Sequence, residues 1–165
     1  MNKAFIKQLK LKNIAIIFII AIFFVIDRYL KKLALGLSSN EEFIIIGKVL
    51  SFKMAPNYQI AFSLPMPTYI ILPITLVIII TLIFIIFKLI LKNKNINHEI
   101  LALTLIVLGA ISNLFDRLQF SYVIDYLYLK NFSILNIADI MISLGTIFFI
   151  ISHYKMNFKK LKRNG

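Results

Sequence analysis

Long apolar runs, separated by shorter polar and often basic stretches, dominate the chain. A helix rises about 1.5 Å per residue, so a run of about 20 residues can cross a hydrocarbon core about 30 Å thick. The pattern predicts four transmembrane helices, over about 12–35, 67–88, 98–116 and 136–155. The second is the clearest, because residues 64–87 carry no charge at all.

Two stretches between these runs have another pattern and predict structure at the membrane surface. In segment 38–64, apolar and polar residues alternate over 50–54, which is the period of a half-buried strand. Segment 118–134 is rich in tyrosine, a residue that is enriched at membrane interfaces. We therefore expect an all-α membrane protein, a single domain over residues 1–165, with a small extracytoplasmic β-sheet and a short surface helix or loop.

Composition and charge support this interpretation and add an orientation. The chain is 60% hydrophobic and only 16% charged, whereas a soluble domain is about 25% charged. Its net charge is +12, and twelve of the nineteen basic residues lie in the N-terminal segment, the loop 88–99 and the C-terminal tail. The positive-inside rule places these three segments, and both termini, in the cytoplasm. The basic clusters predict contact with membrane phospholipids rather than with nucleic acid.

Several kinds of chemistry are excluded by what the sequence lacks. There is no cysteine, so a disulfide framework, thiolate metal ligands and a cysteine nucleophile are all excluded. The two histidines, His98 and His153, lie far apart and have no ligand spacing around them. We expect neither a metal nor a cofactor.

The acidic residues gather on one side of the predicted topology. Six of the seven, including all four aspartates, map to the outer face. Asn113 precedes Asp116, and Asn136 precedes Asp139, by three residues each, and residues three apart share one face of a helix. Two carboxylates held close in a low dielectric cannot both ionise easily, so one keeps a proton. Such a pair could activate a water molecule and protonate a peptide carbonyl without a metal, a serine or a cysteine.

Several short segments then follow one another in an order that is typical of one family. They are Asp27 with Lys31; Asn57-Tyr58-Gln59-Ile60-Ala61-Phe62-Ser63; Asn113 with Asp116 and Arg117; Val123-Ile124-Asp125-Tyr126; and Leu135-Asn136-Ile137-Ala138-Asp139. In order, spacing and topology they resemble the lipoprotein signal peptidase (signal peptidase II) family over nearly the whole chain. The chain also departs from the family pattern: Gln59 and Ile60 replace a glycine and an alanine, Ser112 and Ser121 replace glycines, and Arg28 replaces a glutamine.

The resemblance implies an intramembrane aspartic endopeptidase with Asp125 and Asp139 as its catalytic pair. The supporting or substrate-binding positions that it implies are Asp27, Lys31, Asn57, Asn113, Asp116, Arg117, Asn136 and Ala138. The implied substrate is a prolipoprotein whose cysteine bears diacylglycerol, cut just before that cysteine. The implied place is the outer face of the bacterial cytoplasmic (inner) membrane, and peptide antibiotics such as globomycin would occupy the same site.

Simpler roles remain open for some of these residues. Asp27 and Lys31 have the spacing of an ion pair that stabilises the end of a helix. Asn136 could cap the last helix, with Asp139 complementing the helix dipole. Asp116 and Arg117 are adjacent and cannot face each other on a helix, so each is expected to contact a different partner.

Two alternatives for the whole chain also remain open. Carboxylates in a membrane are candidates for proton relays, so a small proton- or ion-coupled transporter subunit is the main alternative. A transporter predicts a polar path that continues toward the inner side. The other alternative is a lipid-binding scaffold without enzymatic activity.

Overall fold

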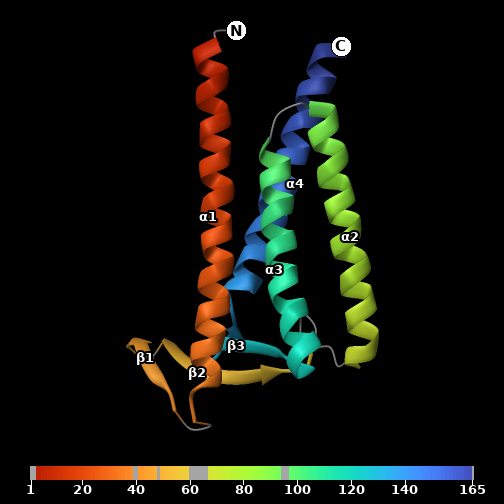
Figure 1. Ribbon diagram of the computed structural model, residues 1–165. Helices are drawn as coiled ribbons and strands as arrows, with labels where there is room; N and C mark the ends of the chain where they lie inside the picture. The colour runs from red at the N-terminus through yellow and green to blue at the C-terminus, as the bar shows by residue number, and fades with distance from the viewer. Residues whose placement is uncertain (1–2, 39–40, 48, 60–66, 94–96, 165) are drawn as a thin grey trace.

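Four helices run side by side and a small sheet lies across one end of them (Figure 1). The computed structural model describes residues 3–38, 41–47, 49–59, 67–93 and 97–164. The helices are α1 (Lys3–Leu35), α2 (Thr68–Asn93), α3 (His98–Phe120) and α4 (Ile137–Asn164). The strands are β1 (Phe43–Ile46), β2 (Leu50–Asn57), β3 (Val123–Leu129) and β4 (Ser133–Leu135). Both chain ends lie at the end of the helices that is remote from the sheet (Figure 1).

Three helices within the described residues are long and apolar enough to cross a membrane, over Thr68–Lys92, His98–Phe120 and Ile137–Tyr154. Large apolar side chains project outward from them; Val77, for example, is 62% exposed. Such a surface requires an apolar environment, which lipid provides. The fourth predicted span, about 12–35, lies within the 33-residue helix α1, and its crossing of the membrane stays a prediction.

The strands form one antiparallel sheet in the order β1-β2-β3-β4. Strand β2 confirms the strand predicted around 50–54. In the predicted surface segment 118–134, α3 continues through Phe120, and β3 and β4 follow it. Strand β3 pairs with β2 on one side and with β4 on the other, so it is the buried inner strand of this half of the sheet. Its β-branched and aromatic residues, which are favoured in strands, could have predicted this strand from the sequence.

A turn at Ser121 directs the chain from α3 into the sheet. Its backbone has φ 66°, in the left-handed region, and its N–H donates to the carbonyl oxygen of Arg117 at 3.0 Å. Helices commonly end on such a residue, and glycine is favoured there because it has no Cβ. Ser121, one of the departures from the family pattern, thus stands where the backbone has a reason to prefer glycine.

Helices α3 and α4 approach each other closely at two glycines. A Cβ on Gly109 of α3 would lie 2.6 Å from the carbonyl oxygen of Ala138, and one on Gly145 of α4 would lie 2.8 Å from that of Ala102. Small residues allow this close approach of backbones in membrane proteins. The contact at Gly109 fixes the first turn of α4, where Asp139 lies.

Candidate active site

Two aspartates from different elements contact the same asparagine, Asn136, where the sheet joins the helices. Asp125 lies in β3 and Asp139 in the first turn of α4. Side chains alternate along a strand, so Asp125 faces away from its neighbours Ile124 and Tyr126, which pack in a small hydrophobic core. Asp125 is nevertheless only 2% exposed. Its carboxylate is therefore enclosed between the sheet and the start of α4.

One asparagine contacts both aspartates. Asn136 donates from Nδ2 to Oδ1 of Asp125 at 2.7 Å, and its Oδ1 accepts the backbone N–H of Asp139 at 2.9 Å. Its own backbone N–H donates to Oδ2 of Asp139 at 3.2 Å. Asn136 thus caps α4, as its residue type predicts, and the same side chain links β3 to that helix.

Two further asparagines each hold one of the carboxylates. Asn57, at the end of β2, donates from Nδ2 to Oδ2 of Asp125 at 2.8 Å. Asn113 of α3 donates from Nδ2 to Oδ1 of Asp139 at 2.8 Å. The Oδ1 atom of Asn113 in turn accepts the ammonium of Lys31 at 2.8 Å. The side-chain amides of Asn57 and Asn113 therefore each direct an N–H group toward one aspartate.

The surroundings of Asp125 favour its protonated form. Burial raises the pKa of this carboxyl, and the charge of Asp139 raises it further, while hydrogen bonds from Asn57 and Asn136 lower it. The balance raises the pKa of Asp125 from its usual 3.8 to about 7. The group therefore gains and loses its proton near neutral pH, which suits acid–base chemistry.

A buried ionic cluster lies next to the site of Asp125 and Asp139. Asp27, Lys31 and Asp116 are all fully buried. The ammonium of Lys31 lies 3.1 Å from Oδ2 of Asp27 and 2.7 Å from Oδ2 of Asp116. Arg28 pairs with the other oxygen of Asp116. Two carboxylates thus face two cations, and this balance offsets the cost of burying each charge.

The cluster holds the backbone next to both aspartates. Oδ2 of Asp116 accepts the N–H of Ile124 at 3.3 Å, directly before Asp125. Oδ1 of Asp27 accepts the N–H of Ala138 at 3.1 Å, directly before Asp139. The ion pair of Asp27 with Lys31 is therefore more than a helix-end contact, because its carboxylate also fixes the start of α4.

Arg117 and Asp116 serve different partners, as their adjacent positions predict. The guanidinium of Arg117 donates to the carbonyl oxygen of Gln59 at 3.1 Å, whereas Asp116 points into the ionic cluster. Arg117 thereby holds the backbone just beyond Asn57. Residues 60–63 of the predicted motif lie outside the described residues.

Three side chains of the site were missed by reasoning from the sequence: Arg28, Ser112 and Tyr126. Ser112 donates from Oγ to Oδ2 of Asp27 at 2.5 Å and accepts the ammonium of Lys31 at 3.3 Å. Arg28 contacts Ser112 as well as Asp116. The available signal was that both Arg28 and Ser112 depart from the family pattern, and the structure brings these two departures together.

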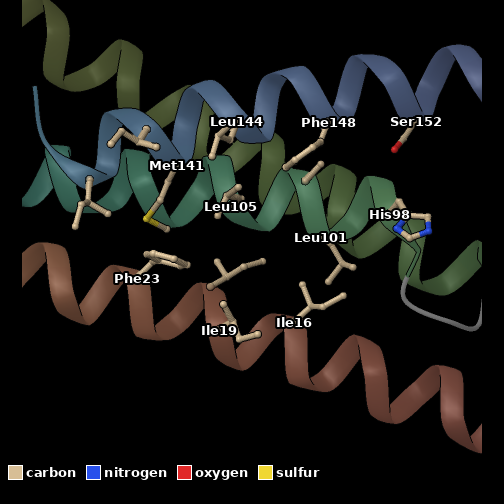
Figure 2. Close-up of a pocket in the computed structure, with 14 residues that line it drawn as sticks. Ile16, Ile19, Phe23, His98, Leu101, Leu105, Met141, Leu144, Phe148 and Ser152 are labelled. Carbon is tan, nitrogen blue, oxygen red and sulfur yellow. The ribbon is translucent and has the colours of Figure 1, made fainter.

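An apolar pocket of about 490 Å³ lies between α1, α3 and α4 (Figure 2). Its lining on α4 runs from Ile137 to Ser152 and does not include Asp125 or Asp139. Side chains of α1 and α4, such as Phe23 and Met141, face each other across it (Figure 2). In the described part of the chain, no three acidic or histidine side chains gather as metal ligands would.

Comparisons with known proteins relate this chain to one family. A family model described as signal peptidase (SPase) II matches residues 19–155. A lipoprotein signal peptidase of Clostridium tetani is 35% identical over 142 residues, which cover 82% of this chain and 89% of that protein. Another, from Buchnera aphidicola, is 35% identical over 149 residues, covering 84% and 94%.

The fold is also known from experiment. A bacterial membrane enzyme solved by the in meso method superposes with a TM-score of 0.76 at 24% identity, covering 90% of this chain and 91% of that one. At this identity the likeness concerns the fold alone. The family match spans most of the chain and includes every aspartate and asparagine described above, and on that ground the protein belongs to the signal peptidase II family.

Proposed function

We propose that this protein is an aspartic endopeptidase that removes signal peptides from diacylglyceryl-modified prolipoproteins, cutting just before the lipidated cysteine. Asp125 and Asp139 form the catalytic pair. The observation that carries the proposal is the sharing of Asn136, whose side-chain amide donates to one aspartate and accepts from the backbone of the other. Family membership supplies the class of reaction.

The two aspartates divide the acid and base roles. Asp139 lies in the first turn of α4, accepts hydrogen bonds from Asn113 and from the backbone N–H of Asn136, and acts as the base. Asp125, with its pKa raised to about 7, carries the proton and acts as the acid. Asp139 takes a proton from a water molecule while Asp125 donates one to the oxygen of the scissile carbonyl. The resulting tetrahedral intermediate is neutral.

Collapse of the intermediate restores both groups. The bond from carbon to the peptide nitrogen breaks, and the proton held by Asp139 passes to that nitrogen. One hydroxyl of the intermediate returns a proton to Asp125 as the new carboxylic acid forms. The amides of Asn57 and Asn113 hold the two carboxylates in place throughout, so little reorganisation is needed.

The apolar pocket between α1, α3 and α4 supports a substrate that carries lipid. It runs from the catalytic end of α4 along the membrane-spanning part of the helix, and its lining is almost entirely hydrocarbon. The acyl chains of a lipidated cysteine, or the apolar part of a signal peptide, can lie there without leaving the bilayer. A proton-coupled transporter would need polar groups along this path instead.

The proposed location follows from the same arrangement. The catalytic end of the bundle faces the outer surface of the bacterial cytoplasmic membrane, and both termini lie in the cytoplasm with their basic residues near anionic phospholipid head groups. Peptide antibiotics such as globomycin bind in the catalytic cleft. Inhibition by globomycin is therefore expected to compete with the substrate.

The test is cleavage of a diacylated prolipoprotein by purified Asp125→Asn and Asp139→Asn variants in detergent. Each substitution keeps the size of the side chain and removes the acid, so we expect turnover to fall at least about 10³-fold. Glu41→Gln is the matched control, because Glu41 is an exposed carboxylate that hydrogen-bonds the backbone of Ser38. Appreciable turnover by either aspartate variant would remove that residue from the pair.

A further inference from the structure

We propose that the hydroxyl of Tyr126 is a positioning group that sets the separation of the Asp125 and Asp139 carboxylates. This inference rests on the proposed function, because it concerns the same catalytic pair. Tyr126 follows Asp125 directly in β3, yet its side chain points to the other face of the strand. It therefore acts on the pair through the backbone and not by touching the carboxylate of Asp125 or of Asp139.

The hydroxyl of Tyr126 connects strand β3 to the start of helix α4. It donates to Oδ1 of Asp27 at 2.9 Å and accepts the backbone N–H of Ile137 at 3.1 Å. Ile137 is the first residue of α4 and precedes Asp139 by two positions. A single oxygen atom thus connects the strand that carries Asp125 to the helix turn that carries Asp139.

The same oxygen of Asp27 also accepts the N–H of Ala138 at 3.1 Å. The first two backbone N–H groups of α4 are therefore fixed together, one by the tyrosine hydroxyl and one by the carboxylate to which that hydroxyl donates. These N–H groups have no partner within the helix, so their external partners determine where the helix starts.

The hydroxyl is held firmly enough for this role. Tyr126 is fully buried, and its ring packs against that of Phe52 with a centroid distance of 5.4 Å. Burial and the adjacent charge of Asp27 raise the pKa of the hydroxyl above its usual value of 10, so it remains a donor at every pH at which the enzyme works. Its position and its proton are both fixed.

Tyr126→Phe removes only this oxygen and is the decisive variant. Without it, the first turn of α4 is free to move away from β3, and a small displacement of reacting groups can reduce a rate about 100-fold. We expect kcat on a diacylated prolipoprotein to fall roughly 10- to 100-fold with KM nearly unchanged. Asp125 would also feel less of the Asp139 charge, so the alkaline limb of the pH–rate profile should move to lower pH by roughly 0.5 unit or more.

The pH profile separates positioning from folding, because it does not depend on the amount of folded enzyme. Tyr128→Phe is the matched control, since Tyr128 lies two residues further along the strand with its ring beneath the ammonium of Lys53. Phe52→Leu loosens the packing of the Tyr126 ring but keeps the hydroxyl. We expect it to lower the melting temperature and to leave the pH profile in place.

Three outcomes would overturn the inference. They are a Tyr126→Phe enzyme with kcat within twofold of the parent, one with lower kcat but an unmoved pH profile, and one that does not fold at all. The last would make the hydroxyl a requirement of folding. If Asp125→Asn also retained turnover, the proposed function itself would fail, so the two failures are distinguishable.

Discussion

Lys31 and Asp116 form an ion pair with an Nζ–Oδ2 distance of 2.7 Å although neither side chain is exposed to solvent. The lysine comes from α1 and the aspartate from α3. Asp116 in turn supports the backbone of Ile124, beside Asp125. The ion pair thus connects the packing of two helices to the placement of a proposed catalytic group.

Loss of the lysine charge should therefore be costly. In Lys31→Met, Asp27 and Asp116 would remain buried without the cation that both contact, which typically destabilises a protein by about 3–5 kcal/mol. We expect a markedly lower melting temperature in detergent and loss of peptidase activity. Lys32→Met is the matched control, because the neighbouring Lys32 is exposed. Equal stability of the two variants would contradict the role of the cluster.

The proton on Asp125 should make both activity and stability depend on pH. The unfolded chain releases this proton near pH 3.8 and the folded chain near pH 7, so the folded state binds more protons between these values. The contribution of this group to stability is therefore greatest below about pH 3.8 and is lost as pH rises through 7. Activity should fall above about pH 7 as the acid loses its proton.

Melting temperatures between pH 5 and 8, compared for the parent and Asp125→Asn, check the stability part of this expectation. The asparagine does not titrate, so its variant should have the flatter profile. A parent protein that becomes more stable than the variant as the pH rises would contradict the raised pKa of Asp125.

The close approach of α3 and α4 predicts a strong effect of a single methyl group. In Gly109→Ala, the new Cβ would lie 2.6 Å from the carbonyl oxygen of Ala138, a backbone atom that can yield only if the start of α4 moves. Overpacking of this kind costs about 1–3 kcal/mol, and the movement would displace Asp139. We expect a large loss of turnover together with a modest drop in melting temperature, both measured on the same detergent samples.

Gly47→Ala is a useful comparison for this variant. Gly47 lies in the turn between β1 and β2 with nothing within 4 Å of an added Cβ, but its φ of 47° is strained for alanine. It should lower stability with little effect on turnover. If turnover and melting temperature fell in the same proportion in both variants, the packing at Gly109 would have no specific effect on the position of Asp139.

Much of the architecture could be predicted from local pattern, and the rest depended on contacts between distant residues. The uncharged run over 64–87 predicted α2 because its length and composition suffice on their own. The pairing of β3 was not predictable in this way, because Leu129 pairs with Leu50, far away in sequence. A surface segment was expected there, but tyrosines indicate an interface and do not specify which backbone pairs with which.

In the site too, local spacing predicted some contacts, and only the fold reveals the others. The spacing of Asn136 and Asp139 predicted that they share a helix face, and the structure shows them hydrogen-bonded. The contacts of Ser112 and Tyr126 with Asp27 were not predicted, because a serine or tyrosine carries no sign of its partner in the sequence. Only the fold brings positions 27, 112 and 126 to one point.

The carboxylate of Asp27 has a consequence for how the protein is made. Its partner Ala138 lies 111 residues further along the chain, so a ribosome adding about 5–20 residues per second completes that partner only after roughly 10 s. During this interval the first helix has left the ribosome while the last has not yet been synthesised. The proposed catalytic pair can thus be assembled only after the start of α4 has been synthesised, and a chain that stops before residue 139 would lack it.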